Sequence, residues 1–147
     1  MPFSAVAGIN QLGLFAGPFT AALLLGVIHC FWHAPLFLTD EWDTARQEPS
    51  QHLAYLVLVV SLSIVLSWLF NETGGSVLLV VLGHNGLNWA LFATGTLTGS
   101  VAAFNWPTAL GLAGLAIIAI IATRGRLGYT GADEPRRGGA LISDSVR

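Results

Sequence analysis

Charged side chains are scarce in this chain. Only 10% of its 147 residues are Asp, Glu, Lys or Arg, whereas 54% are hydrophobic. The chain has no lysine, and its basic residues are six arginines. A soluble domain carries about 25% charged residues, so this sequence lacks the groups that would cover a surface facing water. The deficit indicates an integral membrane protein. A clustered basic face is also missing, which argues against nucleic-acid binding.

Cysteine and early basic residues are scarce as well. Cys30 is the single cysteine, so no disulfide can form within the chain. No basic residue precedes Arg46, and a cleavable signal peptide needs a positively charged region before its hydrophobic segment. We therefore expect the first hydrophobic stretch to remain in the lipid bilayer.

Long apolar runs dominate what is present. A transmembrane helix needs roughly 20 mainly apolar residues to cross a hydrocarbon core of about 30 Å, and four stretches qualify: about 12–38, 53–70, 76–94 and 101–123. Lipid cannot satisfy open sheet edges, so all four are predicted to be helices. Residues 1–123 are therefore expected to form an all-α polytopic membrane helix bundle. The stretch 53–70, LAYLVLVVSLSIVLSWLF, holds no charge and is predicted to be the most lipid-facing span.

The connections between these stretches are polar. Residues 39–51 carry five charges and a proline and are predicted to be a solvated loop, and NETGG (71–75) is predicted to be a tight turn with Ser76 as the N-cap of the next helix. The tail, 124–147, is rich in Arg, Gly, Asp and Ser and is expected to be disordered. The tail holds five arginines, whereas the 39–51 loop holds only Arg46, so the positive-inside rule predicts a cytoplasmic tail. Together with the four apolar stretches, this predicts a multi-pass protein of the cell membrane.

Five polar residues lie inside the predicted spans, and ionisable groups there indicate function by default. His29 and His33 belong to the first span, and His84, Asn85 and Asn88 belong to the third, whereas the other two spans hold nothing comparable. His84 and Asn88 are four residues apart and share one helix face. Asn85 is turned about 100° away. The alternative interpretation is structural, because such groups also form hydrogen bonds between helices that contribute about 0.6 kcal/mol each.

These residues suit acid–base and oxyanion chemistry. One imidazole can accept or donate a proton, and a His/Asn pair can donate hydrogen bonds to a developing oxyanion. Gly86 between His84 and Asn88 would let a neighbouring helix approach closely. The spacing of His29 and His33 also suits two metal ligands, but a zincin helix needs Glu after the first histidine and this chain has Cys30 there. A haem or metal binder using His29, His33 and His84 is a further alternative.

Two segments resemble motifs of the CPBP family, the CAAX-protease and bacteriocin-processing intramembrane proteases. GVIHCFWHAPLFL (26–38) resembles its second motif, and NETGGSVLLVVLGHNGLNW (71–89) resembles its later His-x-x-x-Asn motif. The resemblance implies an all-helical membrane endopeptidase that cleaves a peptide or protein substrate at the membrane. It further implies that His33 positions or ligates and that His84 and Asn88 stabilise the oxyanion. A divalent metal such as zinc, held by His33 and His84, is a possible cofactor on this resemblance.

Two positions depart from the family pattern. The aromatic position four residues before His33 holds His29, which is either a tolerated exchange or an accessory ligand. The EExxxR motif, whose glutamate activates water in the family, occurs nowhere in the chain. We therefore expect an endopeptidase that an upstream segment or a partner helix completes with the glutamate. The alternative is a non-catalytic immunity or binding protein on the same membrane scaffold.

Overall fold

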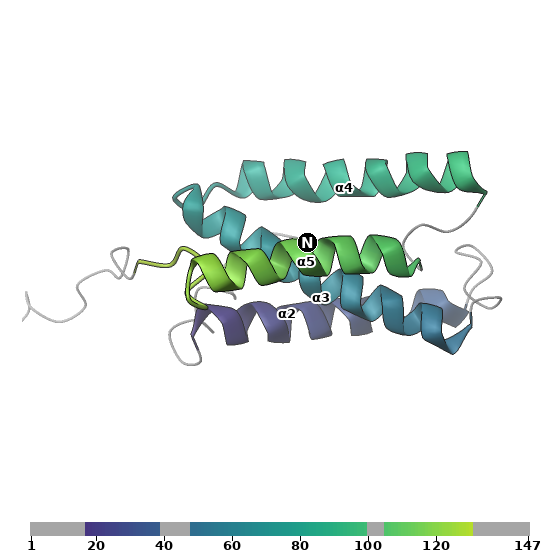
Figure 1. Cartoon of the computed structure of the whole chain (residues 1–147), viewed down its shortest axis with the longest axis horizontal. Coiled ribbons are helices and arrows are strands. Elements are labelled where there is room, and N and C mark those ends of the chain that lie inside the picture. Colours follow the sequence, from purple (N-terminus) through teal and green to yellow (C-terminus); the bar gives the residue numbers. More distant parts are fainter. Residues whose placement is uncertain (1–16, 39–47, 100–104, 131–147) are drawn as a thin grey trace, which may run out of the picture.

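The computed structural model describes residues 17–38, 48–99 and 105–130 (Figure 1). These ranges contain a 3-10 helix, η1 (Ala34–Leu38), and four α-helices: α2 (Pro18–His33), α3 (Pro49–Glu72), α4 (Val77–Thr98) and α5 (Trp106–Ala122). No strand occurs within these ranges. The prediction of an all-α fold is thus confirmed for the described part of the chain.

Proline defines the start of three helices. It occupies one of the first two positions of α2, α3 and α5. Its fixed φ suits a helix there, and its lack of an N–H removes no hydrogen bond, because the first N–H groups of a helix have no acceptor within it. In α3 a capping box adds to this, since the Glu48 side chain accepts from the N3 backbone and the Gln51 side chain accepts from the Glu48 N–H at 2.7 Å. The helix therefore begins at Pro49, four residues earlier than its apolar run predicts.

Glycine and serine define the turn between α3 and α4. Gly74 and Gly75 have φ values of 65° and 85°, a left-handed conformation that glycine adopts without steric cost. Ser76 follows, and its hydroxyl accepts a hydrogen bond from the Leu79 N–H at 3.5 Å. The prediction of Ser76 as an N-cap is confirmed, although α3 extends through Asn71 and Glu72 before the turn begins.

Two of the four predicted spans form helices that are long and apolar enough to cross a membrane. These are α3, with 24 residues, and α4, with 22 residues. The α2 and α5 helices are apolar but shorter, with 16 and 17 residues. In α2 the α-helix ends at His33 and continues as η1. Ala34 keeps a right-handed helical conformation (φ −53°, ψ −38°), but Pro35 has no backbone N–H to continue the α-helical hydrogen bonds. Residues 12–16 and 101–104 of the predicted spans lie outside the described residues.

The α3 helix is the centre of the arrangement. The α2 and α5 helices pack along it, and α4 also contacts it, less extensively (Figure 1). In the most hydrophobic 18-residue stretch of each helix, half of the residues are buried in α3 and 6% in α4. The prediction that 53–70 is the most lipid-facing span is therefore wrong. Three serines of α3, Ser61, Ser63 and Ser67, are also buried.

Small residues allow α2 to lie close against α3. A Cβ atom on Gly26 would stand 2.8 Å from the Val60 Cα atom, a distance that side chains do not tolerate. One turn away, the Ser63 hydroxyl donates a hydrogen bond to the Ala22 carbonyl at 2.8 Å. Close backbone approach and hydroxyl-to-carbonyl bonds are how helices associate in lipid, where apolar burial supplies little driving force. This contact fixes the position of α2, which carries His29 and His33.

The first residues after α5 are ordered, unlike the predicted tail. Leu127 is fully buried, and its carbonyl accepts a hydrogen bond from the Asn71 side chain at 2.8 Å. The expectation of a disordered segment beginning at Arg124 is therefore wrong for residues 124–130, because Leu127 packs in the core cluster with Ile64 and Ala116. Residues 131–147 lie outside the described residues.

Candidate active site: a histidine cluster between α2 and α4

His29 and His33 form a direct pair on α2. They are four residues apart and therefore share one face of the helix. Their Nε2 atoms are 2.9 Å apart, and the ring centroids are 4.9 Å apart with planes inclined by 27°. One Nε2 must carry the proton and the other must accept it, because a neutral imidazole has a single N–H. Both rings are half-buried.

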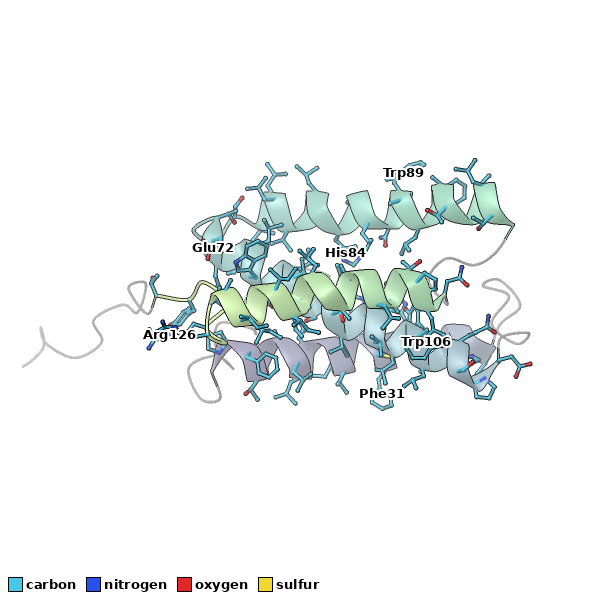
Figure 2. The ribbon with its side chains drawn as sticks, viewed as in Figure 1. Phe31, Glu72, His84, Trp89, Trp106 and Arg126 are labelled. Atoms are coloured by element: carbon cyan, nitrogen blue, oxygen red, sulfur yellow. The ribbon has the colours of Figure 1, made fainter. Side chains whose placement is uncertain are left out.

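His84 joins this pair from α4. Its ring stacks on that of His29 with centroids 6.0 Å apart and planes inclined by 18°. Figure 2 shows His84 directed from α4 toward the other helices. It belongs to the half-buried face of α4, formed by positions at helical spacing: Val77, Val80, His84, Leu87 and Leu91. Two helices far apart in sequence thus bring three imidazoles together, with His29 between the other two.

Tyr55 of α3 completes the surroundings of the pair. Its side chain is 4% exposed, and its ring meets the His33 ring edge-on with centroids 6.3 Å apart and planes at 88°. Sequence reasoning missed Tyr55. The available signal was its phenol, a polar group within an otherwise apolar run, which needs a partner when buried.

Asn88 lies apart from these contacts. Its side chain is exposed, and the ring and hydrogen-bond contacts that join His29, His33 and His84 do not include it. Gly86 is also exposed, and a Cβ atom there would meet nothing within 4 Å. The expectation that Gly86 admits a close neighbouring helix is therefore wrong within the described part of the chain. Of the predicted site, the structure brings together His29, His33 and His84.

Carboxylates lie away from the cluster in the described residues. Glu48 and Glu72 are the acidic residues of ranges 17–38, 48–99 and 105–130, and they occupy opposite ends of α3, as its N-cap and its last residue. The histidine cluster thus offers imidazole acceptors and donors. Within the described ranges it offers no carboxylate base.

The histidine geometry does not fit a three-ligand metal site. Among the described residues no group of three or more His, Cys, Asp or Glu side chains is arranged to hold a metal ion. Within the described ranges, the possible zinc site at His33 and His84 therefore has no third protein ligand.

Comparisons with protein-family models, with curated proteins and with solved structures found no match for this chain. The resemblance to CAAX-type proteases consequently stays a prediction that depends on the two motifs. The structural observation that bears on the site is the approach of the two motif segments, since His33 and His84 belong to one cluster joined through His29.

Proposed function

We propose that this chain is the histidine-bearing part of an intramembrane endopeptidase of the CAAX-protease and bacteriocin-processing type. The observation that carries the proposal is the cluster of His29, His33 and His84 from two helices, within motifs resembling that family. The surroundings support a membrane location. Two helices have the length and composition of spans, and the exposed surface is rich in large apolar side chains such as Phe31 (74% exposed) and Trp32 (68% exposed).

In this proposal the histidines act on the carbonyl group of the scissile peptide. A neutral imidazole donates one hydrogen bond, so His84 can stabilise the oxyanion that forms when water adds to the carbonyl carbon. His33 can also do so when His29 is the donor in their Nε2 contact, because the His33 N–H is then at Nδ1. Asn88 lies one turn after His84 on the exposed edge of α4, where an incoming peptide can reach its amide. Such donors raise the rate because they are already oriented before charge develops.

Activation of the water requires a carboxylate that the described residues do not place beside the cluster. We propose that an upstream segment or a partner helix supplies it as a glutamate. The glutamate accepts a proton from water as the hydroxyl adds to the carbonyl carbon. It then passes that proton to the leaving nitrogen as the C–N bond breaks.

The chain would span the membrane four times with its tail in the cytoplasm.

The decisive experiment is a cleavage assay in lipid nanodiscs. The chain is tested with and without the sequence encoded upstream of Met1, on membrane peptides whose products are identified by mass spectrometry. The extended form is expected to cleave and the present chain alone to be inactive. In the extended form, His33→Ala or His84→Ala should lower kcat by about 10²- to 10³-fold, the usual loss for one oxyanion donor.

His52→Ala is the matched control, because His52 lies at the first turn of α3, where its ring meets the Glu48 carbonyl at 3.2 Å. It should leave cleavage unchanged, and circular dichroism should show equal helix content in all variants. An extended chain that has no EExxxR motif and cleaves nothing would end the enzyme proposal.

A non-catalytic immunity or binding role is the second candidate. The observation that favours it is the position of Glu48 and Glu72, both away from the cluster at the ends of α3. If the protein protects cells or binds a partner equally well with His84→Ala, this second function stands. If that change abolishes the effect, the non-catalytic role is contradicted and the first proposal is favoured.

A further inference from the structure

The outer face of α4 carries a regular seam that nothing in the described part of the chain covers. Positions separated alternately by four and three residues are all exposed: Leu78, Leu82, Asn85, Trp89, Phe92 and Thr96. The four apolar side chains among them are between 57% and 72% exposed. We call these six residues the α4 seam. This alternation of four- and three-residue steps is the heptad pattern by which one helix packs along another.

The seam is distinct from the face that holds the histidine cluster. Successive residues on a helix are turned by about 100°, so Asn85 points away from the direction of His84. Figure 2 shows this division, with Trp89 directed away from the other helices and His84 directed toward them. Only 6% of the residues in the most hydrophobic 18-residue stretch of α4 are buried. The face with His84 makes the contacts of α4 within the chain, whereas the α4 seam is exposed and can contact another molecule.

Asn85 identifies the chemistry of that surface. A carboxamide has two donor hydrogens and an acceptor oxygen, and lipid chains can satisfy none of them. Because every carboxamide both donates and accepts, the best-matched partner for Asn85 is another carboxamide at the same depth. A single Asn within an apolar heptad seam is a known means of fixing register and the number of helices.

A second copy of the chain supplies that partner directly. Two copies inserted with the same topology have parallel α4 helices, so equivalent positions lie at equal depth. Asn85 then faces Asn85 of the second copy, and the apolar seam residues meet their equivalents. Trp89 and Phe92 already stand edge-to-face within the seam, with ring centroids 6.0 Å apart. We propose that two copies of this chain associate through the α4 seam as a parallel helix pair centred on Asn85. This proposal does not depend on the enzymatic one.

Cysteine cross-linking of the full chain in membranes tests the interface. In a Cys30→Ser background, Leu82→Cys and Phe92→Cys each place a thiol on the α4 seam. Ala90→Cys is the control, because residue 90 is also exposed but lies about 120° around the helix from the centre of the seam. Oxidation is expected to yield disulfide-linked dimers at positions 82 and 92 with at least tenfold less at position 90. Equal yields at the three positions, or no dimer at 82 and 92, would overturn the proposal.

Energy transfer between two labelled populations of the full chain in lipid vesicles tests the carboxamide. Asn85→Leu should weaken association by about three- to thirtyfold, the range expected for one interhelical polar contact in a membrane. Asn85→Gln keeps the carboxamide and should retain most of the association. Asn85 is exposed, so neither change should disturb the fold.

Other occupants of the seam give different results. A monomer in vesicles means that lipid or another segment of the same chain covers the seam. That result overturns the proposal. Dimers that form equally well with Asn85→Leu also overturn it.

Discussion

At the scale of single residues, His29 has a position that sequence spacing leaves open. It occupies a place that is aromatic in the motif that 26–38 resembles, so it could be a passive exchange or a participant. The structure puts its Nε2 atom 2.9 Å from that of His33 and its ring in a stack with His84. An apolar ring could provide the stack but not the contact between nitrogens. His29 is thus chemically linked to the histidine that the motif singles out.

This contact predicts the tautomers of the pair. One Nε2 must donate to the other, so one of His29 and His33 should be the Nε2–H form and the other the Nδ1–H form. Long-range proton–nitrogen correlation spectra of histidine-labelled protein in nanodiscs, near neutral pH, distinguish the two. His29→Phe should remove the preference, and the His33 signals should shift toward a tautomer mixture. Identical tautomers at both positions in the unmodified protein would contradict the contact.

At the scale of the elements, the closest helix contact is between α2 and α3 at Gly26. An added Cβ atom would meet the Val60 Cα atom at 2.8 Å, and the Val60 backbone cannot rotate away as a side chain would. Gly26→Ala should therefore lower the free energy of unfolding by about 1–3 kcal/mol, as overpacking usually does. Thermal unfolding in mild detergent, followed by circular dichroism, measures the loss.

Gly111→Ala in α5 is the matched control for this change. A Cβ atom at Gly111 would meet nothing within 4 Å, and alanine in a helix interior is favoured over glycine by about 1 kcal/mol. The control should be neutral or stabilising. Equal destabilisation by the two changes would show that the helix contact at Gly26 is not close.

The burial of α3 and the exposure of α4 illustrate a limit of element-level prediction. Both helices are mainly apolar, and apolar composition suits a helix packed among others as well as one that faces lipid. The distinguishing residues in α3 are small: Ser61, Ser63, Ser67 and Ala54 are all buried. Small residues at helical spacing allow close packing. The uncharged segment 53–70 therefore belongs to the central, most buried helix and not to a lipid-facing one.

At the scale of the whole molecule, the proposed topology makes a prediction about accessibility. Four spans with a cytoplasmic tail place the end of α4 and the segment after α5 on opposite sides of the membrane. In a Cys30→Ser background, a membrane-impermeant maleimide should label Thr98→Cys on intact cells. It should label Thr130→Cys only after lysis, since both positions are exposed in the structure. Labelling of both positions on intact cells would contradict four spans.

The sequence by itself determined the local features. Proline at the starts of α2, α3 and α5, the glycine pair at 74–75 and the Ser76 cap act through adjacent backbone atoms, so the helices and their boundaries follow from neighbouring residues. The four-residue spacing of His29 and His33 likewise placed both on one face of α2. The histidines were recognisable as candidates because ionisable groups are rare in apolar helices.

Only the tertiary structure decided which helix is central and which polar residues meet. Those outcomes depend on contacts between residues far apart in the chain, such as Ser63 with Ala22 and His29 with His84. They also depend on small differences in packing among helices of similar composition. For that reason His29 and Tyr55 joined the cluster, Asn88 stayed exposed outside it, and Asn85 came to lie on a seam facing away from the rest of the chain.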